Sequence, residues 1–264
     1  MGTAILDGLI ASGLDASNIS VSTNSAAKAA ALEAKHGLSA FSLEEDSAAN
    51  LAAVDAANIV IVATKPMYVC DVLESLLEPQ LKADALVISV AAGITTTAMQ
   101  ASLPQGNPVV RAMPNTPAIV GRAVTGISLG ERANESHEKL ARELFETVGT
   151  TLVVDESRID ALSTISGSGP AYVFLLIEEF IKAAKHQGFS DEESALLVNQ
   201  TFLGATELLV ASGKTPEELR KQVTSPNGTT MQAIARMQKS NLDQMFIEAT
   251  DAALARAREI AAGK

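Results

Sequence analysis

Short apolar runs alternate with helical patterns along the first 156 residues of the chain. The strand candidates are rich in Val and Ile, and they are residues 18–23, 58–66, 85–93, 108–114, 125–130 and 150–156. Two of these runs, at 59–63 and 86–92, are almost continuously apolar, which is typical of parallel strands covered on both faces. Helical patterns lie between the runs at residues 3–12, 25–36, 67–81 and 134–148. This alternation predicts an α/β fold with a doubly wound parallel sheet.

After about residue 157 the strand pattern stops, and only helical patterns follow. The helices that the apolar spacing predicts are residues 158–188, 190–212, 215–222, 229–239 and 242–262. Ser190, followed by three acidic residues, is typical of an N-cap with an acidic first turn. The sequence therefore predicts an α/β domain over residues 1–156 and an all-α domain over residues 157–264.

Composition excludes several classes of function. The formal net charge is −11, and a negative surface repels phosphate backbones, so we expect no nucleic-acid partner. No apolar run reaches the roughly 20 residues that a membrane-spanning helix needs, so we expect no membrane partner. The single Cys70 and an N-terminus without a basic segment fit a cytoplasmic protein. With three His and one Cys, no motif has the spacing of metal ligands, so we expect no metal.

Three successive strand candidates end in residues suited to a ligand. In an open parallel sheet, ligands bind beyond the carboxyl ends of the strands. The residues at these three ends are Ala63, Thr64, Lys65 and Pro66, then Ala91, Ala92 and Gly93, then Met113, Pro114, Asn115, Thr116 and Pro117. Each end alone is typical of a plain turn. Three in succession predict a binding crevice.

The first strand candidate ends in Ser22, Thr23 and Asn24. A carboxylate at this point of a dinucleotide-binding sheet would bind the ribose 2′-hydroxyl of NAD and repel a 2′-phosphate. Neutral hydroxyl and amide groups stand here instead, and Lys28 follows nearby. The pattern favours NADP over NAD.

The glycine-rich phosphate loop of a dinucleotide site is incomplete at the start of the chain. Such a site has a strand, the motif G-x-G-x-x-G and a helix. The chain begins at Met1-Gly2 and runs directly into a helical pattern. Gly2 is interpreted as the third glycine of the motif, with the first strand and the first two glycines missing.

Five motifs occur in an order and at spacings that resemble one family. They are VATKP (62–66), SVAAG (89–93), RAMPNTP (111–117), SGSGPAY (166–172) and VTSPNGTT (223–230). Together they resemble pyrroline-5-carboxylate reductase, over essentially the whole chain. The segment LRKQVTSPNGTTMQAI, residues 219–234, is the most specific match. SGSGP itself is interpreted as a close-packing bend that faces the active site.

The resemblance implies a Rossmann domain followed by an all-α dimerisation domain, a homodimer and often a ring of dimers. It implies NADPH as the hydride donor, with NADH possible. The cofactor contacts that it implies are Ser22, Thr23, Asn24, Asn50, Ala63, Lys65, Pro66, Ala91 and Ala92. To these the strand ends and the incomplete loop add Gly2, Thr64 and Asn115.

The resemblance also implies a substrate, 1-pyrroline-5-carboxylate, and a product, L-proline. The substrate is expected near Ser225, Gly228, Thr229 and Thr230. The unpaired N–H groups of the helix that Thr229 and Thr230 open can hold its carboxylate. The hydroxyl of Thr230 is expected to hydrogen-bond the ring nitrogen, and Ser225 is the second catalytic candidate. Reduction of a protonated imine needs no metal or covalent intermediate, so position and electrostatics carry the catalysis.

Two other readings of the sequence stay open. One is an NADP-dependent dehydrogenase of the β-hydroxyacid type, in which a Lys of the helical domain donates a proton. Lys182 and Lys185 are the candidates on the long helix. The other reading is a non-catalytic paralogue that keeps the helical dimer and has lost dinucleotide binding.

Overall fold

A computed structural model of the chain describes residues 1–76, 80–103 and 106–261, and divides the chain into two compact units. The first unit is Met1–Ser168 together with the end of the chain from Leu254, and the second is Gly169–Ala253. The predicted domain boundary at 156/157 marks the change from strands to helices, since the last strand, β7, ends at Val153. The boundary between the compact units falls later, at Ser168/Gly169, and the part of the last helix from Leu254 belongs to the first unit.

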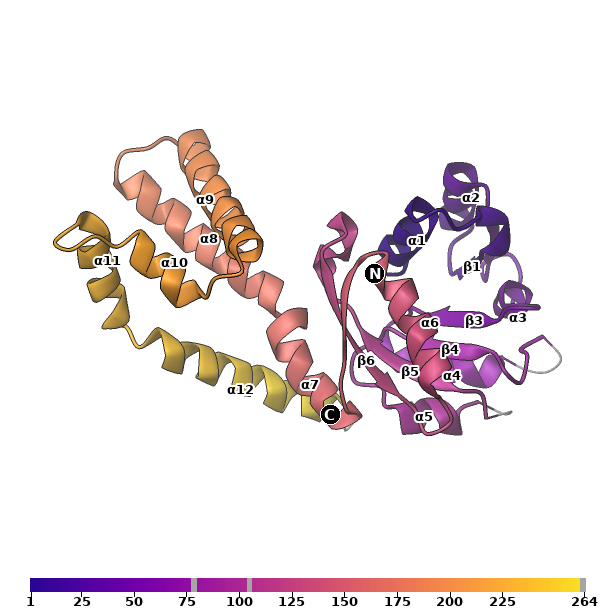
Figure 1. Cartoon of the computed structure of the whole chain (residues 1–264). Helices are drawn as coiled ribbons and strands as arrows, with labels where there is room; N and C mark the ends of the chain where they lie inside the picture. Colours follow the sequence, from indigo (N-terminus) through magenta and orange to yellow (C-terminus); the bar gives the residue numbers. More distant parts are fainter. Residues whose placement is uncertain (77–79, 104–105, 262–264) are drawn as a thin grey trace. The chain divides into compact units, whose positions relative to one another are not determined.

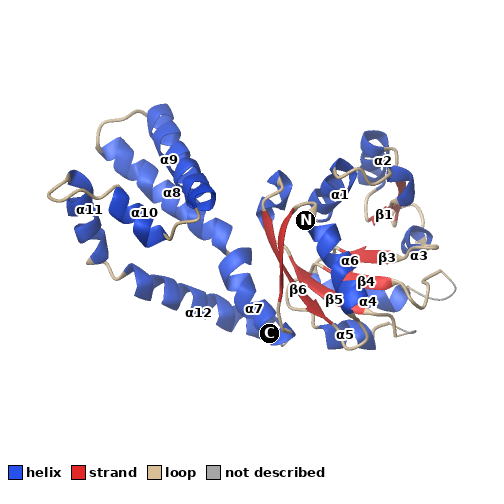
Figure 2. Cartoon of the chain, in the orientation of Figure 1, coloured by secondary structure: helices blue, strands red, loops and turns tan. Residues whose placement is uncertain are grey.

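The strands of the first unit form two sheets (Figures 1 and 2). β1 (Ser20–Thr23) pairs in parallel with β2 (Ser39–Ser42). The second sheet has the order β3-β4-β5-β6-β7. Its strands are β3 (Ile59–Val62), β4 (Leu86–Ser89), β5 (Val109–Met113), β6 (Ala123–Leu129) and β7 (Gly149–Val153).

The predicted doubly wound parallel sheet is present, with one antiparallel pairing. β5 and β6 are antiparallel, because the short turn η3 (Thr116–Val120) joins them in place of a crossover helix. The orders β2-β1 and β3-β4-β5 otherwise match a doubly wound sheet. That topology has one more strand between the positions of β1 and β3, and none of the described residues occupies it.

Helices cover both faces of the five-stranded sheet, which explains the continuous apolar runs. In β4, Val87 packs into a core with α4 and α5, and Ile88 packs into the opposite core with α1 and α6. The helices and short turns of this unit are α1 (Gly2–Ala11), η1 (Ala16–Asn18), α2 (Ala26–His36), α3 (Ala49–Val54), η2 (Pro66–Tyr68), α4 (Val69–Ser75), α5 (Thr96–Ala101), α6 (Glu135–Glu146), η4 (Glu156–Arg158) and α7 (Ile159–Leu162). α1 also places Leu6 in a third core with Leu32 and Leu38, and so connects the two sheets.

One predicted helix is shorter than its pattern. Residues 67–81 were expected to be helical, but η2 precedes α4 and α4 ends at Ser75. Pro66 starts η2 because its fixed φ suits a first helical position. Residues 77–79 of the prediction lie outside the described residues.

The second unit is helical, as predicted. Its helices are α8 (Gly169–His186), α9 (Asp191–Ser212), α10 (Pro216–Gln222), α11 (Thr229–Gln238) and α12 (Leu242–Ala261), the last of which continues into the first unit. Ser190 caps α9 through a reciprocal capping box with Glu193, and Thr215 does the same for α10 with Glu218. The predicted end of α12 at residue 262 lies outside the described residues.

α9 has a property that the sequence reading did not anticipate. By length and composition it could cross a membrane. Only 11% of its most apolar 18-residue stretch is buried within the chain, so it is not a core helix of this chain. Many large apolar side chains of α8 and α9 are also exposed, among them Phe174, Leu196 and Leu203 at 66%, 63% and 52%. Such a surface on an isolated unit is typical of an interaction face.

Candidate active site

The three strand ends predicted to form a crevice lie at one edge of the five-stranded sheet. β3, β4 and β5 are parallel, and the register pairs Val62 with Ser89 and Ser89 with Arg111. The residues after these strands therefore emerge side by side, as the carboxyl ends of parallel strands do. Ala63, Thr64, Lys65 and Ala92 are exposed at this edge, while Ala91 is buried.

The beginning of α1 lies at the same edge. A Cβ atom at Gly2 would lie 3.0 Å from the Cβ of Ala63, so the helix approaches the end of β3 closely. No side chain caps α1 at its N-terminus. Its first N–H groups and the helix dipole can therefore serve a diphosphate, which fits the interpretation of Gly2.

The end of β1 brings together two residues predicted to contact the cofactor. Ser22 Oγ donates a hydrogen bond of 2.8 Å to Asn50 Oδ1, which α3 supplies. Thr23 completes the strand and Asn24 is exposed just beyond it. The residues at this strand end are neutral and can form hydrogen bonds, as the sequence indicated. They could hold an adenosine ribose.

An ion-pair cluster ties α1 to the end of α2. Lys35 Nζ and His36 Nε2 each lie 2.9 Å from Asp7 Oδ1. The hydrogen bond from Lys35 is the main reason that the pKa of Asp7 lies below its usual value, with His36 contributing in the same direction. The cluster fixes the orientation of the helix whose N-terminus reaches the strand ends.

Asn115 differs from the other predicted cofactor residues, because both ends of its amide are already bonded. Its Nδ2 donates to the carbonyl oxygen of Ser166 at 2.9 Å, and its Oδ1 accepts from the N–H of Val124 at 2.9 Å. The side chain is 8% exposed. In the structure Asn115 therefore joins three segments of the first unit, and its contact with a cofactor stays a prediction.

The first two residues of the SGSGP motif, Ser166 and Gly167, end a π-helical turn, Ser163–Gly167, and its Gly169 and Pro170 begin α8. A Cβ atom at Gly167 would lie 3.3 Å from Met113 Cε, which is tighter than ordinary packing. Close packing is therefore seen at Gly167, whereas a Cβ atom at Gly169 would meet nothing within 4 Å, so the interpretation of the whole motif as a close-packing bend that faces the active site stays a prediction.

Sequence reasoning missed Arg111, which is buried beside the loop that follows β4. Arg111 is 3% exposed, and its Nη2 lies 2.6 Å from Asp160 Oδ1. Its Nη1 lies 3.6 Å from Glu156 Oε1. Glu156 in turn accepts hydrogen bonds of 2.6 Å from both the N–H and the hydroxyl of Thr96, the first residue of α5.

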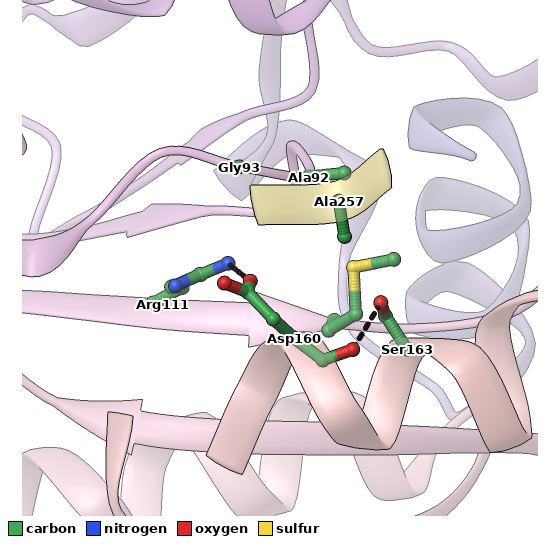
Figure 3. Close-up of a pocket in the computed structure, with 7 residues that line it drawn as sticks. Ala92, Gly93, Arg111, Asp160, Ser163 and Ala257 are labelled. Carbon is green, nitrogen blue, oxygen red and sulfur yellow. Dashed lines mark hydrogen bonds and ion pairs between the residues drawn. The ribbon is translucent and has the colours of Figure 1, made fainter. Parts of the chain in front are cut away.

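A small cavity of about 70 Å³ lies against this cluster (Figure 3). Its walls include Ala92, Gly93, Arg111, Met113, Asp160 and Ser163. The Nε of Arg111 is buried and has no hydrogen-bond partner among the described residues. The volume suits one or two water molecules rather than a nicotinamide ring. Arg111 and Asp160 line the same cavity as Ala92 and Gly93, and Glu156 holds Thr96, so these three charged residues, here called the Arg111 cluster, support the Ala91–Gly93 loop.

The residues predicted to bind substrate form a turn before α11 in the second unit. Gly228 N donates to the carbonyl oxygen of Ser225 at 3.1 Å, and α11 begins at Thr229 with no side-chain cap. The helix starts where the sequence predicts. Its first N–H groups have no partner within the helix and no side-chain cap, so they could bind a substrate carboxylate.

Gly228 occupies a tightly packed position with ordinary backbone angles. Gly228 has an ordinary φ of −77°, and the left-handed residue of the turn is Asn227, at φ 59°. A Cβ atom at Gly228 would lie 2.5 Å from Ser225 Oγ. Glycine is needed here for close packing against Ser225, rather than for unusual backbone angles.

Two consecutive parts of the chain thus differ in character: an α/β unit whose strand ends could hold a dinucleotide, and a helical unit. The α/β part, residues 1–93, matches the family model of NADP oxidoreductase, coenzyme F420-dependent. Residues 156–260 match the model of pyrroline-5-carboxylate reductase dimerisation. Fold and site define a nicotinamide-dependent oxidoreductase.

Whole-chain similarity identifies the family. A pyrroline-5-carboxylate reductase of Pseudomonas aeruginosa is 36% identical over 262 residues, covering 99% of this chain and 93% of that protein. The structure of a pyrroline-5-carboxylate reductase from Coxiella burnetii superposes with a TM-score of 0.90 at 36% identity, covering 98% of this chain and 94% of the other. The Plasmodium falciparum pyrroline carboxylate reductase with NADP bound gives 0.83 at 26% identity, covering 99% and 94%. The chain belongs to the pyrroline-5-carboxylate reductase family.

Proposed function

We propose that this chain reduces 1-pyrroline-5-carboxylate to L-proline with NADPH, using the strand ends of the first unit for the cofactor and the Ser225–Thr230 turn for the substrate. The observation that carries the proposal is the convergence at one sheet edge of the ends of β3, β4 and β5 and the uncapped N-terminus of α1. The family of the chain supports the reaction, and the position of the predicted cofactor residues at this edge supports the proposed cofactor site.

The residues present fit NADPH in three places. Ser22, Thr23, Asn24 and Asn50 would hold the adenosine ribose through hydroxyl and amide groups. The first N–H groups of α1 at Gly2 would hold the diphosphate, and the loop of exposed Ala63, Thr64 and Lys65 and half-buried Pro66 would flank it. Ala91 and Ala92 have small side chains, and Ala92 is exposed, so the nicotinamide could approach the chain closely there. When bound, NADPH supplies the hydride.

The chain's own part in the chemistry is positioning and hydrogen bonding. The N–H groups at the start of α11 hold the substrate carboxylate, and the Thr230 hydroxyl hydrogen-bonds the ring nitrogen. Ser225 lies across the turn from Gly228 and fixes its shape. The imine nitrogen carries a proton, so the adjacent ring carbon accepts the hydride and the nitrogen becomes the secondary amine of proline. No buried catalytic base is required.

A dehydrogenase of the β-hydroxyacid type fits the structure less well. Lys182 would be its proton donor, but its Nζ is bound to Glu179 at 2.7 Å and to Glu178 at 3.0 Å. These hydrogen bonds raise the pKa of Lys182, which makes it a weaker acid. Lys185 is paired with Asp191 at 2.8 Å.

The exposed apolar faces of α8 and α9 support a homodimer. Phe174, Leu196 and Leu203 would be covered by the same face of a second chain. Burial in a dimer would also account for the apolar composition of α9 without a membrane. We extend the proposal to a ring of dimers in the cytoplasm. Light scattering at micromolar concentration tests the assembly, and a monomeric mass would refute it.

A direct assay tests the proposed reaction. Purified protein is mixed with NADPH and 1-pyrroline-5-carboxylate, and loss of nicotinamide absorbance is followed alongside proline formation. β-Hydroxyacids with NADP serve as the comparison. Reaction with hydroxyacids and none with the cyclic imine would favour the dehydrogenase reading. Failure to bind NADPH in a calorimetric titration would favour a non-catalytic protein.

A further inference from the structure

A carboxylate that the sequence reading did not consider lies at the N-terminus of α2. Glu44 Oε2 accepts a hydrogen bond of 2.9 Å from the N–H of Ala26, the first residue of this 11-residue helix. The N-cap residue Ser25 makes no capping bond with its own side chain. α2 has no acidic residue in its first turn, so Glu44 supplies from outside the negative charge that the helix end favours.

The sheet brings Glu44 to the ribose end of the cofactor site. β1 and β2 are parallel, with Thr23 opposite Ser42, and the N–H of Leu43 donates to the carbonyl oxygen of Thr23 at 2.9 Å. Glu44 follows directly, and its own N–H donates to Ser42 Oγ at 3.2 Å, which fixes the backbone there. The carboxylate is thus held just beyond the strand end formed by Ser22, Thr23 and Asn24.

We propose that Glu44 is a cofactor-specificity residue that lowers the preference for NADPH over NADH. This inference rests on the proposed binding of the adenosine ribose at the end of β1. In dinucleotide-binding sheets the 2′ position of that ribose lies at this strand end, where a carboxylate bonds a free hydroxyl and repels a phosphate. The helix N-terminus that would attract a 2′-phosphate is already occupied by Glu44.

The expected size of the effect follows from the exposure of the group. Glu44 is exposed, so water screens its repulsion of a phosphate. Two exposed charges in contact interact strongly enough to change an equilibrium constant by roughly five- to tenfold. Lys28, also exposed in the first turn of α2, would offset part of this repulsion. Glu44 therefore moderates the selectivity that the neutral strand end provides, and makes NADH a usable donor.

The variant Glu44→Gln isolates the charge, because a Gln oxygen can still accept from the Ala26 N–H and keep the helix capped. We expect KM for NADPH to fall and the ratio of kcat/KM for NADPH to that for NADH to rise by about five- to tenfold, with kcat unchanged. The matched control is Glu45→Gln, which removes the same charge from the next exposed residue. Its ratio is expected to equal that of the parent. An unchanged ratio in Glu44→Gln, or an equal rise in Glu45→Gln, would overturn the proposal.

A binding measurement separates this inference from the reaction itself. Adenosine 2′,5′-bisphosphate and AMP are titrated calorimetrically into the parent and both variants. Tighter binding of the bisphosphate, but not of AMP, in Glu44→Gln alone supports the role of Glu44 whether or not the protein turns over substrate. Equal gains for both ligands, or no gain for either, contradict it. If the parent does not turn over the cyclic imine but Glu44→Gln still binds the bisphosphate selectively more tightly, the proposed reaction is contradicted and the specificity role of Glu44 is not.

Discussion

Replacing Arg111 with Met is expected to destabilise the α/β unit by about 3 kcal/mol. Arg111 is 3% exposed, and its guanidinium contacts the carboxylates of Asp160 and Glu156. Met fills much of the same volume but leaves both carboxylates without their cation. Removing one partner of a buried pair costs about 3–5 kcal/mol. Because the side chains of Asp160 and Glu156 are each 27% exposed, partial hydration of the remaining charges favours the lower end.

Urea unfolding followed by circular dichroism measures this loss. Arg142→Met is the matched control, since Arg142 lies 3.3 Å from Glu146 and both side chains are 46% exposed. The control is expected to change the free energy of unfolding by less than about 1 kcal/mol. Equal losses in the two variants would refute the reasoning that burial makes the Arg111 cluster structural.

The same variant has an expected kinetic effect. Glu156 holds the N-terminus of α5 through Thr96, and α5 follows the Ala91–Gly93 loop. With Arg111 gone, this loop loses part of its support, so KM for NADPH is expected to rise more than kcat falls. Arg142→Met is expected to leave both constants unchanged. A fall in kcat alone would contradict a supporting role for the cluster.

Three further predictions test other parts of the account. Thr230→Ala is expected to lower kcat by roughly 10- to 100-fold, the equivalent of one hydrogen bond to a charged group, with little change in NADPH binding; Thr230→Ser should restore most of the rate, and equal kinetics in the Ala variant would remove Thr230 from the mechanism. Gly149→Ala is expected to cost more than about 3 kcal/mol in urea unfolding, because φ is 158° and the new Cβ would collide with the backbone of Ala123; unchanged stability would contradict the register of β6 and β7. Asp7→Asn is expected to lower the free energy of unfolding at neutral pH. The difference in this free energy between parent and variant should vanish as the pH falls below 3.8 and through the lowered folded-state pKa of Asp7, because the stabilisation exists only while the carboxylate is ionised. A difference that persists in acid would refute the role of the Lys35 contact.

Much of the fold could be predicted from the spacing of apolar residues. The runs that became β3 and β4 are buried on both faces, and this burial is what makes such runs continuous. The strand β2 (Ser39–Ser42) was missed because its four residues, SAFS, show no Val or Ile. The helices α3 and α5 were missed because six residues are too few to show a helical period. The antiparallel pairing of β5 and β6 has no signature in residue spacing, because strand direction depends on the connection.

The candidate site was predictable where it depends on strand ends and hidden where it depends on distant contacts. Ser22 and the Ala63–Pro66 loop stand at strand ends, so a rule about parallel sheets could find them. Glu44 caps a helix that starts 18 residues earlier, and only the pairing of β1 with β2 brings the two together. Asn115 likewise bonds Ser166, 51 residues away. Local sequence carries no record of such pairings.

Transfer of an isotopic label tests the central claim most directly. The protein is incubated with 1-pyrroline-5-carboxylate and NADPH in which both hydrogens of the reactive nicotinamide carbon are deuterium, and the product is examined by mass spectrometry and NMR. The account predicts proline with one deuterium on the ring carbon next to nitrogen that was the imine carbon, formed in equal amount to the NADP produced. Unlabelled proline, or NADPH that stays unoxidised while the cyclic imine is present, would contradict it.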